Sequence, residues 1–136
     1  MSEPSRGLAF AAVGAGGAIG ALSRWGVDIA VDGLGYPRPY ATLTVNVVGC
    51  LLMGLLVSYV LSHPARHGLW RPFLAVGVLG GFTTFSAFAL DIVVVARDGH
   101  VLPAIAYLVA STGGALLALW AGFEIGHALG RRRNAS

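Results

Sequence analysis

Charged residues are scarce in this chain, which has no lysine and a single cysteine. Only 11% of its 136 residues are charged and 56% are hydrophobic, whereas soluble domains carry about 25% charged residues. This composition excludes an ordinary soluble domain and predicts a membrane protein. The lone Cys50 excludes an intrachain disulfide and is expected to be a small packing residue.

The residue sets that support most enzyme chemistry are also missing. The chain has no Ser–His–Asp set, no pair of carboxylates, no cysteine cluster and no phosphate-binding glycine loop. His63 and His67 have the spacing of a metal-binding pair, but Pro64 lies between them and there is no third ligand. The sequence therefore predicts neither an enzyme nor a zinc site.

The basic residues are nine arginines, which give a net charge of +3. Most of them stand at the ends of apolar segments, where anionic lipid headgroups would meet them. We therefore expect the lipid bilayer, and not nucleic acid, as their partner.

Four apolar stretches are long enough to cross a membrane, which takes roughly 20 residues. They cover residues 8–30, 41–61, 72–95 and 101–129, and the segments between them are rich in Pro, Gly or charge. The sequence thus predicts an all-α membrane protein, with residues 1–136 forming one four-span domain. The 20 glycines, several of them four residues apart, favour close packing of the helices.

Uncharged polar side chains recur inside three of these spans. Thr42 and Asn46 share a face of the second span, and Tyr107 and Ser111 share a face of the fourth. The third span contains "GGFTTFSAF" at residues 80–88. A single hydroxyl in a membrane helix often bonds only to its own backbone, but neutral donors on three spans together suit a path along which an ion exchanges water for fixed hydrogen bonds.

The same nine residues predict a break in the third span near Gly80–Thr84. Gly80 and Gly81 weaken the helix, and the carbonyls freed by a break are tolerated only where protein, water or an ion satisfies them. Phe85 and Phe88 lie one turn apart on one face. They either fill a core or face lipid, or they turn the electropositive edges of their rings towards a small anion.

Three charged residues within or near the spans need an explanation of their own. Arg24 and Asp28 lie four residues apart on the first span, so they form either an interfacial pair or a functional anchor. Asp91 follows Phe88 by three residues and lies on a similar face near the end of the third span.

"GGFTTFSAF" closely resembles the third-span signature of the Fluc (CrcB) fluoride channels, usually GGxTTFSTF. "GAIGALSRW" in the first span and "TLTVNVVGCLLMG" in the second agree with the same family in order and spacing. The resemblance covers residues 14–111 and the four-span plan.

This resemblance implies an antiparallel, dual-topology dimer with two fluoride pores and a buried structural sodium ion. It further implies passive efflux of cytoplasmic fluoride across a prokaryotic cell membrane, which lowers fluoride toxicity. The positions that match the family's fluoride pore are Phe85, Phe88, Asn46, Ser86, Tyr107, Ser111 and Thr42. Gly80 and Thr83 match positions whose carbonyls hold sodium, and Arg24 matches the first-span arginine.

The chain departs from the family pattern at three positions. Ala87 replaces a usual Thr, Asp91 replaces a usual Glu, and Ala115 stands where a further Ser often extends the polar series of the fourth span. These departures bear on whether both pores of a homodimer would be complete.

Two other functions fit a chain of this size. A small four-span drug or cation exporter would need a carboxylate buried in its first span, and Asp28, the only candidate, lies too near the end of that span. The second alternative is that the chain is a non-conducting partner subunit of a heterodimeric channel.

The distribution of arginine bears on this second alternative. With Arg24 left out as intramembrane or interfacial, two arginines lie on one side (Arg38 and Arg97) and six on the side of the termini (Arg6, Arg66, Arg71, Arg131, Arg132 and Arg133). This bias predicts cytoplasmic termini, whereas a dual-topology homodimer should be nearly balanced. Two arrangements therefore stay open: a homodimer, and a heterodimer with an oppositely oriented homologue.

Overall fold

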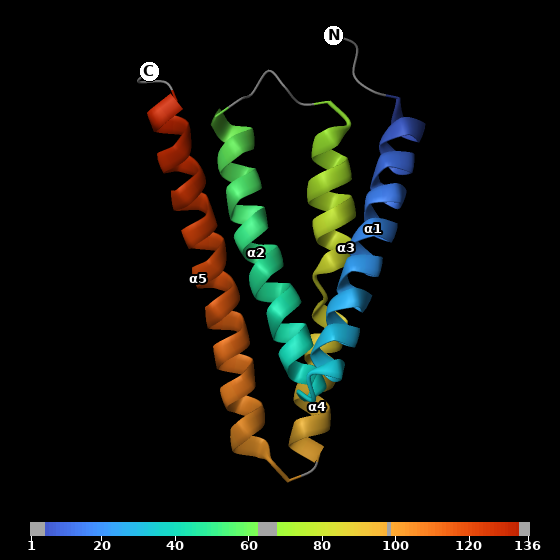
Figure 1. Cartoon of the computed structure of the whole chain (residues 1–136), viewed down its shortest axis with the longest axis vertical. Coiled ribbons are helices and arrows are strands. Elements are labelled where there is room, and N and C mark those ends of the chain that lie inside the picture. The colour runs from blue at the N-terminus through green and yellow to red at the C-terminus, as the bar shows by residue number, and fades with distance from the viewer. Residues whose placement is uncertain (1–4, 63–67, 98, 134–136) are drawn as a thin grey trace.

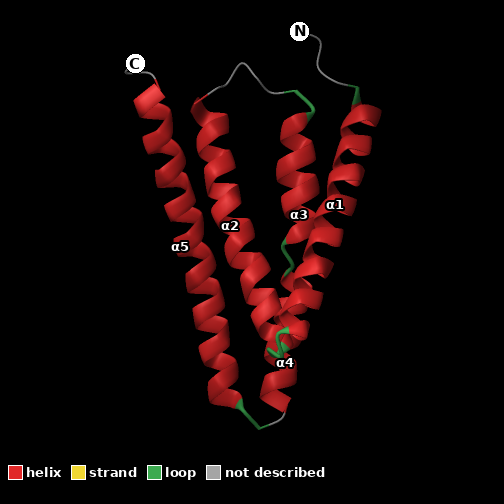
Figure 2. Cartoon of the chain, viewed as in Figure 1, coloured by secondary structure: helices red, strands yellow, loops and turns green. Residues whose placement is uncertain are grey.

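The computed structural model describes residues 5–62, 68–97 and 99–133. Within these ranges every regular element is a helix, as Figure 2 shows. The elements in chain order are α1 (Arg6–Gly33), α2 (Arg38–Ser62), η1 (Pro72–Leu79), α3 (Gly80–Phe82), α4 (Phe85–Arg97) and α5 (Val101–Arg133).

Four helical stretches are long and apolar enough to cross a membrane. They cover Arg6–Gly33, Arg38–Ser62, Pro72–Arg97 and Val101–Arg131. The predicted all-helical membrane fold with four spans is thereby confirmed, and this is a multi-pass membrane protein. The first helix begins earlier than the predicted span because the Ser5 hydroxyl accepts a hydrogen bond from the Leu8 N–H, at 3.4 Å.

The spans run alternately up and down (Figure 1). The start of α1, the start of η1 and the ends of α2 and α5 lie at one end of the molecule, and the α1–α2 and α4–α5 turns lie at the other. Each of these turns contains a glycine with positive φ, Gly35 at 78° and Gly99 at 80°. Arg38 and Arg97 therefore lie at the end opposite to Arg6 and Arg131.

Two helix pairs account for most of the packing: α1 against η1 and α3, and α2 against α5. Glycine allows the close approach in both pairs. A Cβ added at Gly20 would collide with the Val78 carbonyl oxygen, and one at Gly54 with the Leu119 carbonyl oxygen. The expected role of glycine in close helix packing is therefore confirmed at these two positions.

The third span is broken where the sequence predicts it. Helix α3 ends at Phe82, Thr83 is extended (φ −77°, ψ 157°), and α4 begins at Phe85. The preceding segment η1 is a π-helix, which the sequence does not predict. Such wider turns are frequent at functional sites, and this one leads directly into the break.

Candidate functional site: the broken third span

The backbone of Thr84 lies in the break and is held by the side chain of Asn46 from α2. The Asn46 Nδ2 donates to the Thr84 carbonyl at 3.0 Å, and the Asn46 Oδ1 accepts from the Thr84 N–H at 2.9 Å. One side-chain amide thus satisfies both backbone polar groups of a residue that neither α3 nor α4 includes.

The side chain of Thr84 caps the helix that follows. Its Oγ1 accepts a hydrogen bond from the Ala87 N–H at 3.2 Å, the geometry of a helix N-cap, and lies 3.2 Å from the Ser86 hydroxyl. The sequence placed Thr84 only among the hydroxyls of the third span and did not predict this cap. The available signal was a threonine that follows the two glycines and stands three residues before Ala87.

Thr83 contributes its backbone to the site and not its hydroxyl. The Thr83 hydroxyl donates to the Leu79 carbonyl at 2.9 Å, which is the back-bonding considered above as the alternative for an isolated threonine. The Thr83 carbonyl accepts from the Nη1 of Arg24 at 3.4 Å. Because no ion pair joins Arg24 to Asp28 within the described residues, the structure does not support the interfacial pair.

Two grooves meet at Thr84. We call the first the aromatic groove. It is lined by Asn46, Cys50, Thr83, Thr84, Phe85, Phe88, Ser111, Thr112, Ala115 and Leu116. We call the second the charged mouth. It is lined by Arg24, Asp28, Arg38, Thr42, Val45, Thr84, Ser86, Ala87 and Leu90. The predicted pore residues are therefore divided, because Ser86 and Thr42 line the mouth and not the aromatic groove, and Tyr107 lines neither.

Three aromatic rings form a continuous series beside the break. The ring centroids of Phe85 and Phe88 are 5.9 Å apart, and those of Phe88 and Tyr107 are 5.7 Å apart. The Phe85 side chain is 78% exposed in the single chain. The series thus runs from a buried polar cluster at Tyr107 to the outer surface of the chain.

That polar cluster joins three spans. The Tyr107 hydroxyl from α5 donates to the Asp91 Oδ2 from α4 at 3.5 Å, and the hydroxyls of Thr42 and Ser111 lie next to it. Thr42, Asp91 and Ser111 are all buried. The sequence placed Asp91 only on a face similar to that of Phe88, whereas the structure brings its carboxylate to the hydroxyls.

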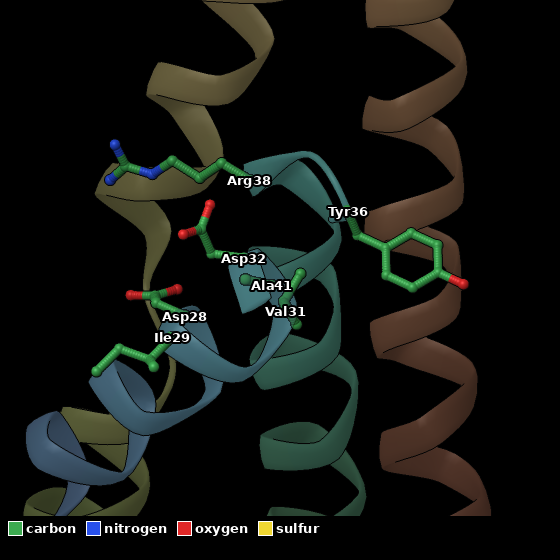
Figure 3. Close-up of a pocket in the computed structure, with 7 residues that line it drawn as sticks. All are labelled: Asp28, Ile29, Val31, Asp32, Tyr36, Arg38 and Ala41. Atoms are coloured by element: carbon green, nitrogen blue, oxygen red, sulfur yellow. The ribbon is translucent and has the colours of Figure 1, made fainter. Parts of the chain in front are cut away.

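Acidic and basic side chains surround the charged mouth and the adjoining turn. Figure 3 shows Arg38, Asp32 and Asp28 one after another along one side of the α1–α2 turn, with Tyr36 directed to the opposite side. No ion pair joins Arg38 to either carboxylate among the residues described. These charges are therefore available to act on an ion that approaches the mouth.

Some predicted positions lie apart from the two grooves. Gly80 lines neither groove and is exposed in the single chain. His63 and His67 lie outside the described residues, and within the described part of the chain no three His, Cys, Asp or Glu side chains group as metal ligands.

A comparison with known proteins identifies the family. Residues 11–123 match the family described as CrcB-like protein, Camphor Resistance (CrcB). The chain belongs to the CrcB family. Its expected membership, inferred from the motifs in three spans, is thereby confirmed.

Curated CrcB relatives match over most of this chain. A protein of Paracoccus denitrificans is 42% identical over 88% of this chain and 95% of its own length. One of Rhizobium meliloti is 41% identical over 86% of this chain and 94% of its own. One of Thermobifida fusca is 48% identical over 81% of this chain and 82% of its own. The first two are named fluoride-specific ion channel FluC and the third FluC 2.

Proposed function

We propose that this CrcB-family chain is a fluoride-selective ion channel, and not an enzyme, that allows passive efflux of cytoplasmic fluoride through a prokaryotic cell membrane. One observation of the structure carries the proposal: the rings of Phe85 and Phe88 line one groove with the amide of Asn46 at a helix break. The names of the relatives, all ion channels, support it.

The chemistry of the two grooves suits a small, strongly hydrated anion. Hydroxyl and amide donors can replace part of its water shell, and the positive edges of aromatic rings attract it weakly. Phe85, Phe88 and Asn46 are uncharged, so an anion bound there can also leave. We propose that fluoride enters through the charged mouth and passes the hydroxyls of Thr84 and Ser86. It then follows a narrow path along the aromatic groove.

A single subunit leaves this path open at one side, which favours a dimer. Phe85 is 78% exposed, and the backbone at Gly80 is exposed as well. Unsatisfied backbone groups are not tolerated against lipid. A second copy in antiparallel orientation would cover them and generate two equivalent paths by two-fold symmetry.

Sodium is proposed as a structural ion of that dimer, held by the carbonyls of Gly80 and Thr83. Hard cations take oxygen ligands, and two copies of the pair would supply four. Neither carbonyl receives the N–H that a continuous helix would give it, because the Thr84 and Ala87 N–H groups bond elsewhere. The Arg24 contact to the Thr83 carbonyl is long, at 3.4 Å, and leaves one lone pair free.

Efflux from liposomes tests the proposed function. The purified chain is reconstituted, the vesicles are loaded with fluoride or chloride, and release is followed with ion-selective electrodes. We expect fluoride release that exceeds both chloride release and the leak from empty vesicles. Fluoride release no faster than from empty vesicles would reject a channel formed by this chain alone.

Arg38 is expected to raise the local concentration of anions at the mouth. Arg38→Gln should lower fluoride flux about two- to fivefold at an ionic strength near 0.01 M, and Asp28→Asn should raise it. Both effects should vanish near 1 M, where the screening length is about 3 Å. Arg97→Gln is the control, because Arg97 lies at the same end of the molecule but lines neither groove. Equal flux in Arg38→Gln and Arg97→Gln at low salt would contradict this role.

The orientation of the chain separates a homodimer from a heterodimer. We expect a homodimer, because Phe85, Phe88 and Asn46 are all present. A topology reporter fused to the C-terminus of the chain expressed alone should therefore give signal on both sides of the membrane. A signal only in the cytoplasm, as the arginine bias predicts, would instead favour an oppositely oriented homologue as partner.

A further inference from the structure

The break in the third span redirects two backbone N–H groups to side chains. In a continuous α-helix the Thr84 N–H would bond to the carbonyl four residues earlier, which belongs to Gly80. It bonds instead to the Asn46 Oδ1 at 2.9 Å. No donor among the described residues takes its place on the Gly80 carbonyl.

The same replacement occurs one turn later. The Ala87 N–H would bond to the Thr83 carbonyl in a continuous helix. It bonds instead to the Thr84 Oγ1 at 3.2 Å, so the Thr83 carbonyl is left to the long contact from Arg24. The two carbonyls that lose their helical partners are the two to which the proposed function assigns a cation.

We propose that Asn46 and Thr84 are positioning residues that create this cation site by removing its competing hydrogen-bond donors. Asn46 releases the Gly80 carbonyl and Thr84 releases the Thr83 carbonyl. Neither side chain needs to contact the cation. The inference rests on the proposed function for the identity of the two carbonyls, and it gives Thr84 a role that the pore assignment does not contain.

Inside the bilayer, the loss of one side-chain acceptor is enough to change the hydrogen-bond partner of a backbone N–H at the break. A backbone N–H inside the membrane must find an acceptor, because an unsatisfied one is strongly destabilising there. If the Thr84 hydroxyl is removed, the Ala87 N–H in the first turn of α4 loses its acceptor. We infer that the chain then rewinds at the break, so that the Thr83 carbonyl accepts this N–H as it would in a continuous helix. The carbonyl is then occupied by a donor and disfavours a cation.

The test compares Thr84→Val, which keeps the shape of the side chain and loses the hydroxyl, with Thr84→Ser, which keeps the hydroxyl. Each purified full-length protein is melted in detergent over a range of sodium concentrations, with N-methylglucamine keeping the ionic strength constant. Thr44→Val is the control, because the Thr44 hydroxyl bonds only to the Tyr40 carbonyl of its own helix, at 2.7 Å.

We expect sodium to raise the melting temperature of the wild type, Thr84→Ser and Thr44→Val. In Thr84→Val the sodium concentration that gives half of this effect should increase about tenfold or more, the equivalent of one lost hydrogen bond to a charged group. Thr84→Ala is the second hydroxyl-free variant should valine prevent folding, and circular dichroism checks that helix content is kept.

A wild-type sodium response in Thr84→Val or Thr84→Ala would overturn the proposal, and so would a wild-type protein that does not respond to sodium. Fluoride efflux measured on the same wild-type preparation reports separately on the proposed function. Efflux without the sodium response would therefore reject the positioning role but not the proposed channel function. Absence of efflux would reject the channel function itself.

Discussion

Replacing either Phe85 or Phe88 by isoleucine should reduce fluoride flux at least about tenfold, which corresponds to about 1.4 kcal/mol of lost stabilisation along the path. Isoleucine keeps most of the bulk but has no ring edge to offer an anion. The two rings lie 5.9 Å apart, and both line the aromatic groove. Efflux from liposomes measures the effect.

The matched control for these variants is Phe10→Ile. Phe10 lies on α1, is 77% exposed and lines neither groove, so its replacement removes a ring of similar exposure away from the path. Assembly of each variant is checked by size-exclusion chromatography, because lost flux from an unassembled protein would be uninformative. Wild-type flux in both Phe85→Ile and Phe88→Ile would refute the assignment of the aromatic groove as the path.

Much of this fold can be predicted from the sequence because the bilayer imposes simple rules. Span number follows from the length of apolar segments, and the break follows from Gly80–Gly81 followed by hydroxyl residues. Phe85 and Phe88 lie on one face because the helical repeat requires it. The structure confirms the spans and the break, whereas the roles of these residues stay predictions.

What the sequence could not predict depends on contacts between segments distant in the chain. The pairing of Asn46 with Thr84 joins positions 38 residues apart, and that of Arg24 with Thr83 joins positions 59 apart. No periodic pattern in the sequence indicates either of these two contacts. The sequence offered Asp28 as one possible partner of Arg24 because helical spacing is visible, whereas a backbone carbonyl freed by a break is not.

Asn46→Asp should block conduction almost completely while the protein still assembles. The carboxylate has nearly the shape of the amide, but it places a negative charge beside a narrow anion path. At about 4 Å and an effective dielectric constant of about 20, repulsion of a fluoride ion amounts to about 4 kcal/mol, or about a thousandfold in rate. The carboxylate also cannot donate to the Thr84 carbonyl, as the Asn46 Nδ2 does at 3.0 Å.

The same variant separates the two roles given to Asn46. A carboxylate oxygen can still accept the Thr84 N–H, so the Gly80 carbonyl stays free and the sodium-dependent increase in melting temperature should persist while flux is lost. Acidification should restore part of the flux, because the introduced carboxyl group is neutral once protonated and can again donate to the Thr84 carbonyl. Efflux is measured at neutral and acidic pH against wild type. Undiminished fluoride flux in Asn46→Asp at neutral pH would show that the ion does not pass near this side chain.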